Sequence, residues 1–300
     1  MTPLVSVVIP SYKHGHLIGR ALQSVIDQSY SNWEAIVVDN HSPDQTEQVV
    51  QGFNDPRIKL LKIHNNGVIA TSRNVGIQAA RGDWIAFLDS DDWWDSNKLG
   101  KCLEFANDDF DVIYHKLKCY TVNSLNEIKI DGEVGCRDLA VKPYYSLLNN
   151  GPGLTTSAII ARRSSIISVN CFDDDMNIVG GEDIDLWLRL AKIECKFKLV
   201  DSFLGFFFIG GVVHMTAPDK SLRTIDFLQR KYCGSEFSSI PIWMHKSRLA
   251  SYIKLQQYSL VMKYLTRILR ELHFYKTLLV FKRLIRSVVF DKFLNIKTIN

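Results

Sequence analysis

Short apolar segments alternate with helix-like segments through the first 90 residues of this chain. The apolar segments are rich in β-branched and aromatic residues, and the segments between them carry apolar residues at helical spacing. In chain order, the predicted strands and helices are 5–10, 18–28, 34–38, 45–53, 58–63, 70–80 and 84–88. This alternation is typical of a mainly parallel sheet whose strands are joined by crossover helices. The sequence therefore predicts an α/β fold, and a hydrophobic content of 46% supports a globular protein.

Beyond residue 110 the pattern is less regular. Further strands are predicted at 112–117, 158–161 and 198–208, and a helix is predicted at 183–193. Two parts are expected from this change of pattern. A first domain spans 1–220, with one half at 1–110 and another at 111–220, and a basic helical extension spans 221–300.

Polar residues follow each of the first four predicted strands. They are Tyr12, then Asp39 and Asn40, then Asn65, Asn66 and Gly67, and finally Asp89, Ser90 and Asp91. In open α/β sheets, ligands bind beyond the carboxyl ends of the strands, where these side chains would gather. The sequence therefore predicts a binding site at this edge of the sheet.

Asp89 and Asp91 form an Asp-x-Asp pattern directly after the strand 84–88. Two carboxylates at a strand end can hold a hard divalent cation while diphosphate oxygens and water complete its octahedral shell. The alternative is a solvated acidic turn that caps a helix, since acidic residues favour such positions. Asp92 is expected to begin the next helix.

Four segments, 6–12, 33–39, 73–76 and 82–92, together resemble the motifs of glycosyltransferase family 2. The resemblance covers roughly residues 4–215. It implies that 1–220 is a catalytic domain, with a nucleotide-binding half at 1–110 and an acceptor half at 111–220. It implies a GT-A fold and an inverting, hexosyltransferase-type enzyme with a UDP-sugar donor. It also implies a divalent cation, Mn²⁺ or Mg²⁺, on the donor diphosphate, and a glycan or lipid-linked acceptor in cell-surface polysaccharide biosynthesis.

The resemblance assigns a role to individual residues. Nucleotide-sugar binding falls to Pro10, Tyr12, Asp39, Asn66, Gly67, Arg73, Asp89 and Ser90, and metal binding to Asp91, Asp89 and His214. Three alternatives stay open. Asp39 could cap the following helix, Arg73 could form a surface salt bridge, and His214 could be an ordinary loop residue. The last alternative arises because Gly-Gly-Val-Val stands at 210–213, where many relatives carry a Tyr-Arg or similar basic pair.

A second motif begins at Gly180 and Gly181, which deliver two acidic residues, Glu182 and Asp183, to the start of a helix. It resembles the Glu-Asp motif of the same family. Direct displacement at a sugar carbon needs a base within hydrogen-bond reach of the acceptor hydroxyl, and Asp183 is predicted to be that base. Alternatively, acidic residues here only stabilise the helix dipole. Glu182 and Thr156 are expected on the acceptor side, although a simple strand start also explains Thr156.

The extension differs in charge from the rest of the chain. Residues 246–300 hold twelve Lys or Arg and two acidic residues, a net charge of +10, so the total of +4 leaves −6 for residues 1–245. Apolar residues recur at helical spacing between 260 and 272 beside Lys263, Arg267 and Arg270. Such a helix can lie on an anionic membrane surface. Packing against the catalytic domain or against a second subunit in a homodimer is the alternative, and no nucleic-acid partner is expected.

The remaining features bear on location and on rival functions. The N-terminus lacks the pattern of a secretory signal, and six spaced cysteines suggest reduced thiols, so a cytoplasmic or peripheral membrane protein is expected. A dinucleotide oxidoreductase is disfavoured because no G-x-G-x-x-G follows the first strand. Two alternatives remain, a polyprenyl-phosphate sugar synthase and a non-catalytic nucleotide- and membrane-binding protein.

Overall fold

The computed structural model describes residues 2–107, 109–123, 127–134, 136–210, 217–272 and 277–280. The chain forms two compact units. The first comprises Met1–Leu147 and Pro152–His214, and the second comprises Leu148–Gly151 and Met215–Asn300.

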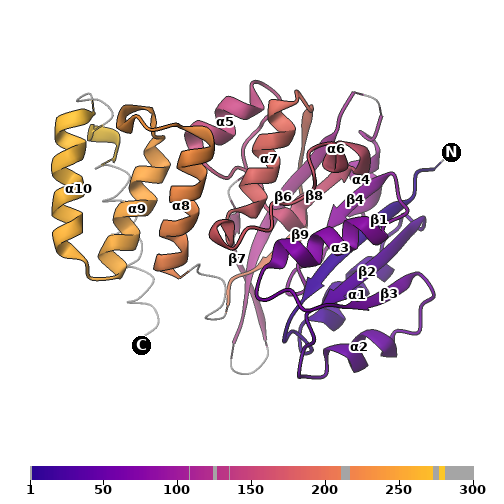
Figure 1. The fold of residues 1–300 in the computed structure, drawn as a ribbon. Coiled ribbons are helices and arrows are strands. Elements are labelled where there is room, and N and C mark those ends of the chain that lie inside the picture. The colour runs from indigo at the N-terminus through magenta and orange to yellow at the C-terminus, as the bar shows by residue number, and fades with distance from the viewer. Residues whose placement is uncertain are drawn as a thin grey trace. The chain divides into compact units, whose positions relative to one another are not determined.

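The first unit is built around one mixed sheet (Figure 1). Its strands are β1 (Val5–Ser11), β2 (Trp33–Asp39), β3 (Ile58–Lys62), β4 (Trp84–Phe87), β5 (Trp93–Trp94), β6 (Val112–Val122), β7 (Ile128–Val134), β8 (Ile159–Arg162) and β9 (Phe197–Phe208). They lie in the order β3-β2-β1-β4-β8-β6-β9-β5, and β7 pairs with β6. The predicted parallel arrangement holds from β3 to β4, whereas β8 runs antiparallel to both β4 and β6. The second half of the sheet is therefore mixed.

The helices of this unit cover both faces of the sheet. They are α1 (Ile18–Ile26), α2 (Thr46–Gly52), α3 (Ile69–Ala79), α4 (Lys98–Leu103), α5 (Pro143–Asn150, whose end enters the second unit), α6 (Arg163–Ser168) and α7 (Glu182–Lys192), with short 3-10 turns η1 (Thr156–Ala158) and η2 (Met176–Ile178). The buried side of α1 packs with Val7 and Ile9 of β1. Gly76 of α3 lies against Val8, which points to the opposite face, so close that a Cβ at Gly76 would fall 2.4 Å from Val8 Cγ1. The absence of a side chain at Gly76 therefore brings α3 onto β1.

Strands β1 and β2 form because both of their faces are covered. Every residue from Val5 to Ser11 and from Trp33 to Asp39 is buried, as expected for the near-continuous apolar runs of parallel strands. Apart from Asp39 at the end of β2, Glu34 is the charged exception within them. Its carboxylate accepts hydrogen bonds from Ser6 Oγ at 2.7 Å and Arg81 N at 2.7 Å, which ties both strands to the segment that begins β4.

The second unit contains helices α8 (Pro218–Tyr232), α9 (Ile242–Lys254) and α10 (Tyr258–Glu271) and the turn η3 (Phe237–Ser239). Helix α9 contacts both α8 and α10. A buried polar network joins the three helices, because Arg248 of α9 donates to Gln229 of α8 at 3.0 Å and to Tyr264 of α10 at 3.2 Å. Among the described residues, no helix has the length and apolar character needed to cross a membrane.

Lys98, at the start of α4, is a buried amine inside the first unit. It is 0% exposed, its Nζ lies 3.7 Å from the ring centroid of Trp94, and it has no hydrogen-bond partner among the described residues. Burial lowers the pKa of Lys98 to about 8, against a smaller opposing effect of Cys102. A lysine in the unfolded chain has a pKa of about 10.4, so the unfolded state binds more protons between these two values. The free energy of unfolding therefore rises with pH across this window.

Replacing Lys98 should stabilise the protein. We expect Lys98→Met to raise the free energy of unfolding at pH 7 by about 1–3 kcal/mol, because the charged amine no longer has to be buried. The gain should shrink at pH 10, where the lysine of the native state is neutral. Urea denaturation at both pH values measures it, with Lys101→Met on the exposed side of the same helix as the control. Equal stability of the two variants at pH 7 would contradict the prediction.

Candidate active site

The carboxyl ends of β1, β2, β3 and β4 meet at one edge of the sheet, around a cavity of about 310 Å³. The cavity is lined by Pro10, Ser11, Tyr12, His14, Asn40, Asn65, Gly67, Ile69, Ser72, Asp89, Ser90 and Asp91. The structure therefore brings together polar residues that follow four separate strands, as predicted from their positions.

Most of the residues predicted to bind a nucleotide sugar line this cavity, and three do not. Asp39 is 1% exposed, and its two carboxylate oxygens accept hydrogen bonds from Ser42 N at 2.9 Å and Ser42 Oγ at 2.5 Å. Asn66 is exposed and adopts a left-handed backbone with φ of 52° beside Gly67. Arg73 is buried, with 3% of its surface exposed, and does not line the cavity.

The turn Asp89–Asp92 is held in place by residues far away in the sequence. Asp89 N donates to Ser157 Oγ at 3.0 Å, and the Tyr120 hydroxyl donates to the main-chain oxygen of Asp91. Within the turn, Asp92 N donates to Asp89 O at 3.0 Å. The strands and turns that carry Ser157 and Tyr120 thus fix the direction of the acidic side chains.

Asp92 does not begin a helix, contrary to the expectation from sequence. It leads into the short strand β5, and its Oδ1 accepts a hydrogen bond from Phe208 N at 2.8 Å at the end of β9. Local sequence cannot reveal this role, because the two residues lie 116 positions apart. Burial, and then the charges of Asp91 and Asp89, raise the pKa of Asp92 well above its usual value.

The donor set at this turn fits a hard divalent cation. Asp89 and Asp91 both line the cavity. Together with burial, their negative charges raise the pKa of Asp92, and a cation bound here would offset this negative charge. Across the described ranges, no three His, Cys, Asp or Glu residues converge as a complete set of protein ligands. A cation held here would take its other ligands from a diphosphate and water. His214, the third predicted ligand, lies outside the described residues.

Arg73 connects this turn to the second predicted motif. Its Nη2 donates to Asp89 Oδ1 at 2.8 Å, and its Nη1 donates to Glu182 Oε1 at 2.9 Å. Burial by itself would lower the pKa of Arg73, but the two carboxylates outweigh it and raise the pKa. Glu182 Oε2 also accepts a hydrogen bond from Gly180 N at 2.7 Å, which fixes the start of α7. The Asp89–Arg73–Glu182 bridge therefore joins the end of β4 to the first turn of α7.

Asp183 follows Glu182 and is only partly exposed. Desolvation, and then the neighbouring charge of Glu182, raise the pKa of Asp183 to about 6, against the opposing charge of Arg73. A carboxylate with this pKa is ionised at neutral pH and still accepts a proton readily, as a general base requires. Asp185, by contrast, is 0% exposed and pairs with Arg189 at 2.7 Å, so its role in α7 is structural.

Thr156 lies on η1 and is 4% exposed. Its neighbour Ser157 is the residue that contacts Asp89, and Trp94 Nε1 donates to Ser157 O at 2.7 Å. Sequence reasoning did not assign a role to His14, whose Nδ1 lies 2.7 Å from Ser90 Oγ in the cavity wall. The sequence signal for His14 was its position, two residues after the predicted binding residue Tyr12.

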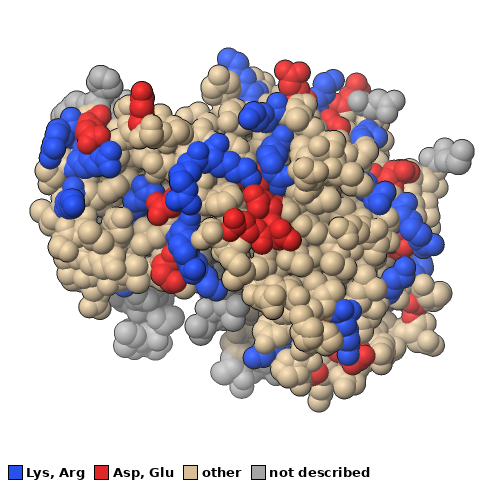
Figure 2. Space-filling model, in the orientation of Figure 1, with Lys and Arg blue, Asp and Glu red and all other residues tan. Residues whose placement is uncertain are grey.

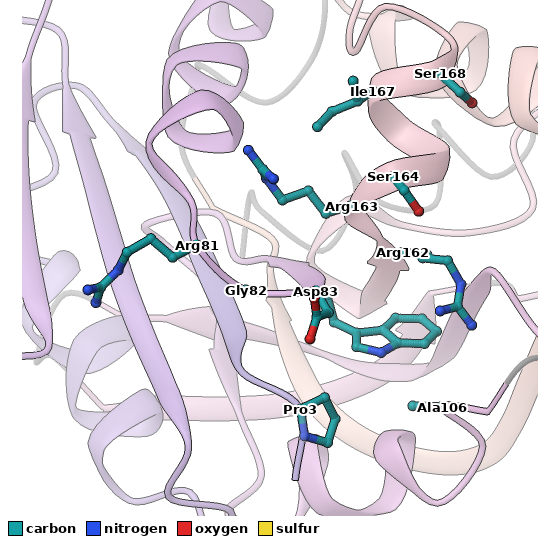
Figure 3. Close-up of a pocket in the computed structure, with 11 residues that line it drawn as sticks. Pro3, Arg81, Gly82, Asp83, Ala106, Arg162, Arg163, Ser164, Ile167 and Ser168 are labelled. Atoms are coloured by element: carbon teal, nitrogen blue, oxygen red, sulfur yellow. The ribbon is translucent and has the colours of Figure 1, made fainter. Parts of the chain in front are cut away.

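A wider cavity of about 650 Å³ opens at the other end of the strands (Figure 3). It is lined in part by Arg81, Arg162 and Arg163, whose side chains point in different directions in Figure 3. Arg81 pairs with Glu34 at 2.8 Å, and Arg162 lies 3.7 Å from Asp111. Because these guanidinium groups do not converge, this cavity offers no shared anion site.

Comparison with known proteins identifies the family. Residues 6–169, more than half of the chain, match the model of glycosyl transferase family 2. The UDP-Glc:alpha-D-GlcNAc-diphosphoundecaprenol beta-1,3-glucosyltransferase WfgD of Escherichia coli is 34% identical over 190 residues, which cover 63% of this chain and 70% of that protein. The putative teichuronic acid biosynthesis glycosyltransferase TuaG of Bacillus subtilis is 44% identical over 105 residues, which cover 34% of this chain and 42% of that relative.

Solved structures show the same fold. The mannosyltransferase PcManGT from Pyrobaculum calidifontis, in complex with GDP-Man and Mn²⁺, matches 96% of this chain and 81% of its own, with a TM-score of 0.59 at 14% identity. S. aureus TarS 1-349 in complex with UDP-GlcNAc matches 82% of this chain and 79% of its own, with a TM-score of 0.57 at 19% identity. With its GT-A fold, its Asp-x-Asp turn and the family match over most of the first unit, this chain is a glycosyltransferase that belongs to glycosyltransferase family 2.

Proposed function

We propose that this chain transfers a sugar, with inversion, from a UDP-sugar to a glycan or lipid-linked acceptor in cell-surface polysaccharide biosynthesis. The observation that carries the proposal is the bridge through Arg73, which holds the acidic turn of the donor cavity and the Asp183 helix start together. The two named relatives support the acceptor class, because their names refer to teichuronic acid biosynthesis and to a diphosphoundecaprenol acceptor.

The donor half of the reaction would use the cavity at the strand ends. Tyr12, Gly67 and Ser90 line it and would contact the nucleotide sugar there. A divalent cation, Mn²⁺ or Mg²⁺, held by Asp91 with Asp89 beside it, would neutralise the charge that develops on the departing diphosphate. His214 remains a predicted contributor to this site.

The acceptor half would depend on Asp183. Its carboxylate takes the proton from the acceptor hydroxyl as the oxygen attacks the anomeric carbon, and the bond to the diphosphate breaks on the opposite face. Inversion follows from this single displacement, without a covalent intermediate. Arg73, whose Nη1 and Nη2 donate to Glu182 and Asp89, acts here as a positioning residue. Glu182 and Thr156 stay predictions for the acceptor side.

Asp183→Asn should abolish most transfer. We expect the turnover rate to fall by about 10²–10⁴-fold, because the amide cannot accept the proton, while donor binding stays within about twofold. Product formation from UDP-sugar donors and calorimetric binding of UDP measure the two effects. Asp174→Asn, at an exposed position before the same helix, is the matched control.

Near wild-type transfer by Asp183→Asn to a hydroxyl acceptor would contradict the assignment of Asp183 as the general base. Retained transfer to a polyprenyl phosphate would instead favour the alternative synthase, since a phosphate acceptor needs little deprotonation. If neither donor hydrolysis nor transfer occurs with added manganese, the chain is a non-catalytic binding protein.

The rate should also depend on pH through Asp183. Because the base must be ionised, kcat/KM should fall as the pH drops through about 6, the raised pKa of Asp183. Glu182→Gln removes the nearest negative charge, so the acid limb should move to lower pH. Initial rates between pH 4.5 and 8 test this, and Asp174→Asn should leave the limb in place. A limb that stays fixed in Glu182→Gln would contradict the proposed coupling.

We also propose that α10 contacts an anionic membrane surface. Tyr264 and Ile268 face the interior of the second unit, whereas Tyr258, Met262 and Leu269 are each 63% exposed. With the partly exposed Leu265, these exposed residues recur at positions i, i+4, i+7 and i+11, which gives one apolar stripe along the helix. Lys263 and Arg270 are exposed beside it, and Figure 2 shows basic side chains over this helix. An apolar stripe flanked by basic residues suits an anionic headgroup layer.

The intact chain should therefore sediment with vesicles that contain anionic lipid at low salt, and less so at high salt. Lys263→Glu combined with Arg270→Glu should weaken binding about tenfold or more, because each basic residue near the surface contributes about 1 kcal/mol. Lys129→Glu, on the exposed strand β7 of the first unit, is the control. Failure of the intact protein to sediment would reject this contact, and packing of α10 against a second copy would then be tested by the oligomeric state.

A further inference from the structure

Apolar side chains from four strands share one face of the sheet beside the acidic turn. Directly paired residues of neighbouring strands lie on the same face, as do residues two apart along a strand. Trp93 of β5 pairs with Phe206 of β9, with the ring centroids 4.6 Å apart. Phe208 pairs with Tyr120 of β6, and Tyr120 pairs with Ile130 of β7. We refer to the members of this face that reach the surface as the apolar strip: Trp93, Phe206, Phe208, Val122, Ile130 and Ile128.

The strip begins at the acidic turn. The Tyr120 hydroxyl donates to the main-chain oxygen of Asp91, and Phe208 N donates to Asp92 Oδ1 at 2.8 Å. Strands β4, β6 and β9 end at the same edge of the sheet, because β8 is antiparallel to both β4 and β6, and β9 is parallel to β6. The strip therefore adjoins the candidate site directly.

The far end of the strip is exposed. Ile128 and Ile130 on β7 are 48% and 50% exposed, and Val122, the partner of Ile128, is partly exposed. Among the described strands, β7 pairs with β6 alone, so no strand covers its outer edge. From β5 through β9 and β6 to β7, the strip crosses three strand spacings, about 14 Å in total. It is a narrow apolar surface that is long enough for a few isoprene units.

Two basic residues lie beside the strip. Arg20 Cζ, from α1, lies 4.2 Å from the ring centroid of Trp93 and 4.5 Å from that of Tyr120. Lys118 pairs with Phe206, which places it on the face of the strip, and it is exposed. Apolar surface and positive charge therefore lie side by side, which is complementary to a ligand with an anionic head and a hydrocarbon chain.

Two other occupants fit the strip less well. A sugar needs hydrogen-bond partners for its hydroxyl groups, whereas five of the six side chains have no polar atom and the ring of the sixth, Trp93, is covered by Arg20 and Phe206. A stable interface with a second copy buries about 800 Å² per partner, which is more than six side chains that are at most half exposed can supply.

We propose that the apolar strip binds the hydrocarbon chain of a lipid-linked acceptor, whose diphosphate lies beside Arg20 and Lys118. Contact with the chain removes apolar surface of both partners from water and so adds to the affinity. The strip holds the acceptor by its lipid while the sugar on the other side of the diphosphate enters the site. This inference rests on the proposed function, since it narrows the acceptor of that reaction to the lipid-linked class.

The test uses the full chain with manganese and saturating UDP, so that the donor site is filled. In the wild type, farnesyl diphosphate, with three isoprene units, should bind about tenfold more tightly than dimethylallyl diphosphate, with one, as measured by calorimetry. The two probes share the diphosphate, so the ratio of their affinities reports the chain alone. Equal affinity for the two probes would overturn the inference.

Ile128→Ser combined with Ile130→Ser tests the surface itself. We expect the double variant to lose most of the preference for farnesyl diphosphate, because both side chains of the exposed end become polar, while the affinity for dimethylallyl diphosphate stays unchanged. Val141→Ser is the matched control, since Val141 is a 78% exposed apolar residue of the first unit outside the strip. It should keep the wild-type ratio, and an unchanged ratio in the double variant would also overturn the inference.

Two further measurements locate the chain. Met262→Ser changes the exposed stripe of α10, and a ratio lost there but kept in the double variant would place the chain on α10 and reject the strip. A farnesyl diphosphate with a diazirine at the chain end needs no substitution: cross-linking should label β7, and labelling only outside the four strands would contradict the inference. If the wild type does not bind UDP, the proposed function itself fails. UDP binding with equal affinity for the two probes rejects the strip alone.

Discussion

The buried ion bridge through Arg73 is the interaction on which the rest of the candidate site depends. A guanidinium that is 3% exposed could not remain charged in the interior without partners, and Asp89 and Glu182 supply them from β4 and α7. These partners belong to the two motifs that the reaction needs, the acidic turn and the helix that carries Asp183. Loss of Arg73 would leave two carboxylates without their cation, so the bridge holds the donor and base sides in one arrangement.

The acidic turn depends equally on distant supports. Ser157 and Tyr120 bind its main chain, and Asp92 is fixed by Phe208 N, so strands from the second half of the sheet hold residues of the first half. The mixed strand arrangement after β4 provides these contacts. The antiparallel strand β8 follows directly on η1, which brings Ser157 beside the end of β4. The architecture thus orients carboxylates that a solvated turn would leave mobile.

The two units differ in how their buried polar and charged groups are paired. In the first, buried charges such as Glu34 and Arg73 are compensated by named partners, whereas Lys98 is not, which makes it the exception in the described core. In the second, Arg248 and Tyr264 bind the helices together while the exposed stripe of α10 stays unused by that packing. The packing of the second unit therefore uses only part of the circumference of α10.

Much of this protein follows from its sequence alone. The β-branched runs and helical spacing determined the first seven strands and helices, their parallel order was correctly expected, and the four polar strand ends located the cavity. Local patterns suffice there because periodicity and strand ends are properties of neighbouring residues. The elements β5, β7, α5 and α6 were not predicted, and β5 and α6, with two and six residues, are too short to show a periodic pattern.

Only the tertiary structure decided what individual polar side chains do. It engaged Asp39 with Ser42, placed Asn40 in the wall of the cavity, and made Asp92 a support for β9 instead of the start of a helix. It also joined Arg73 to two carboxylates, one of which lies 109 positions away. Hydrogen-bond partners of this kind depend on which segments the fold brings within about 3 Å, and sequence spacing carries no record of that distance.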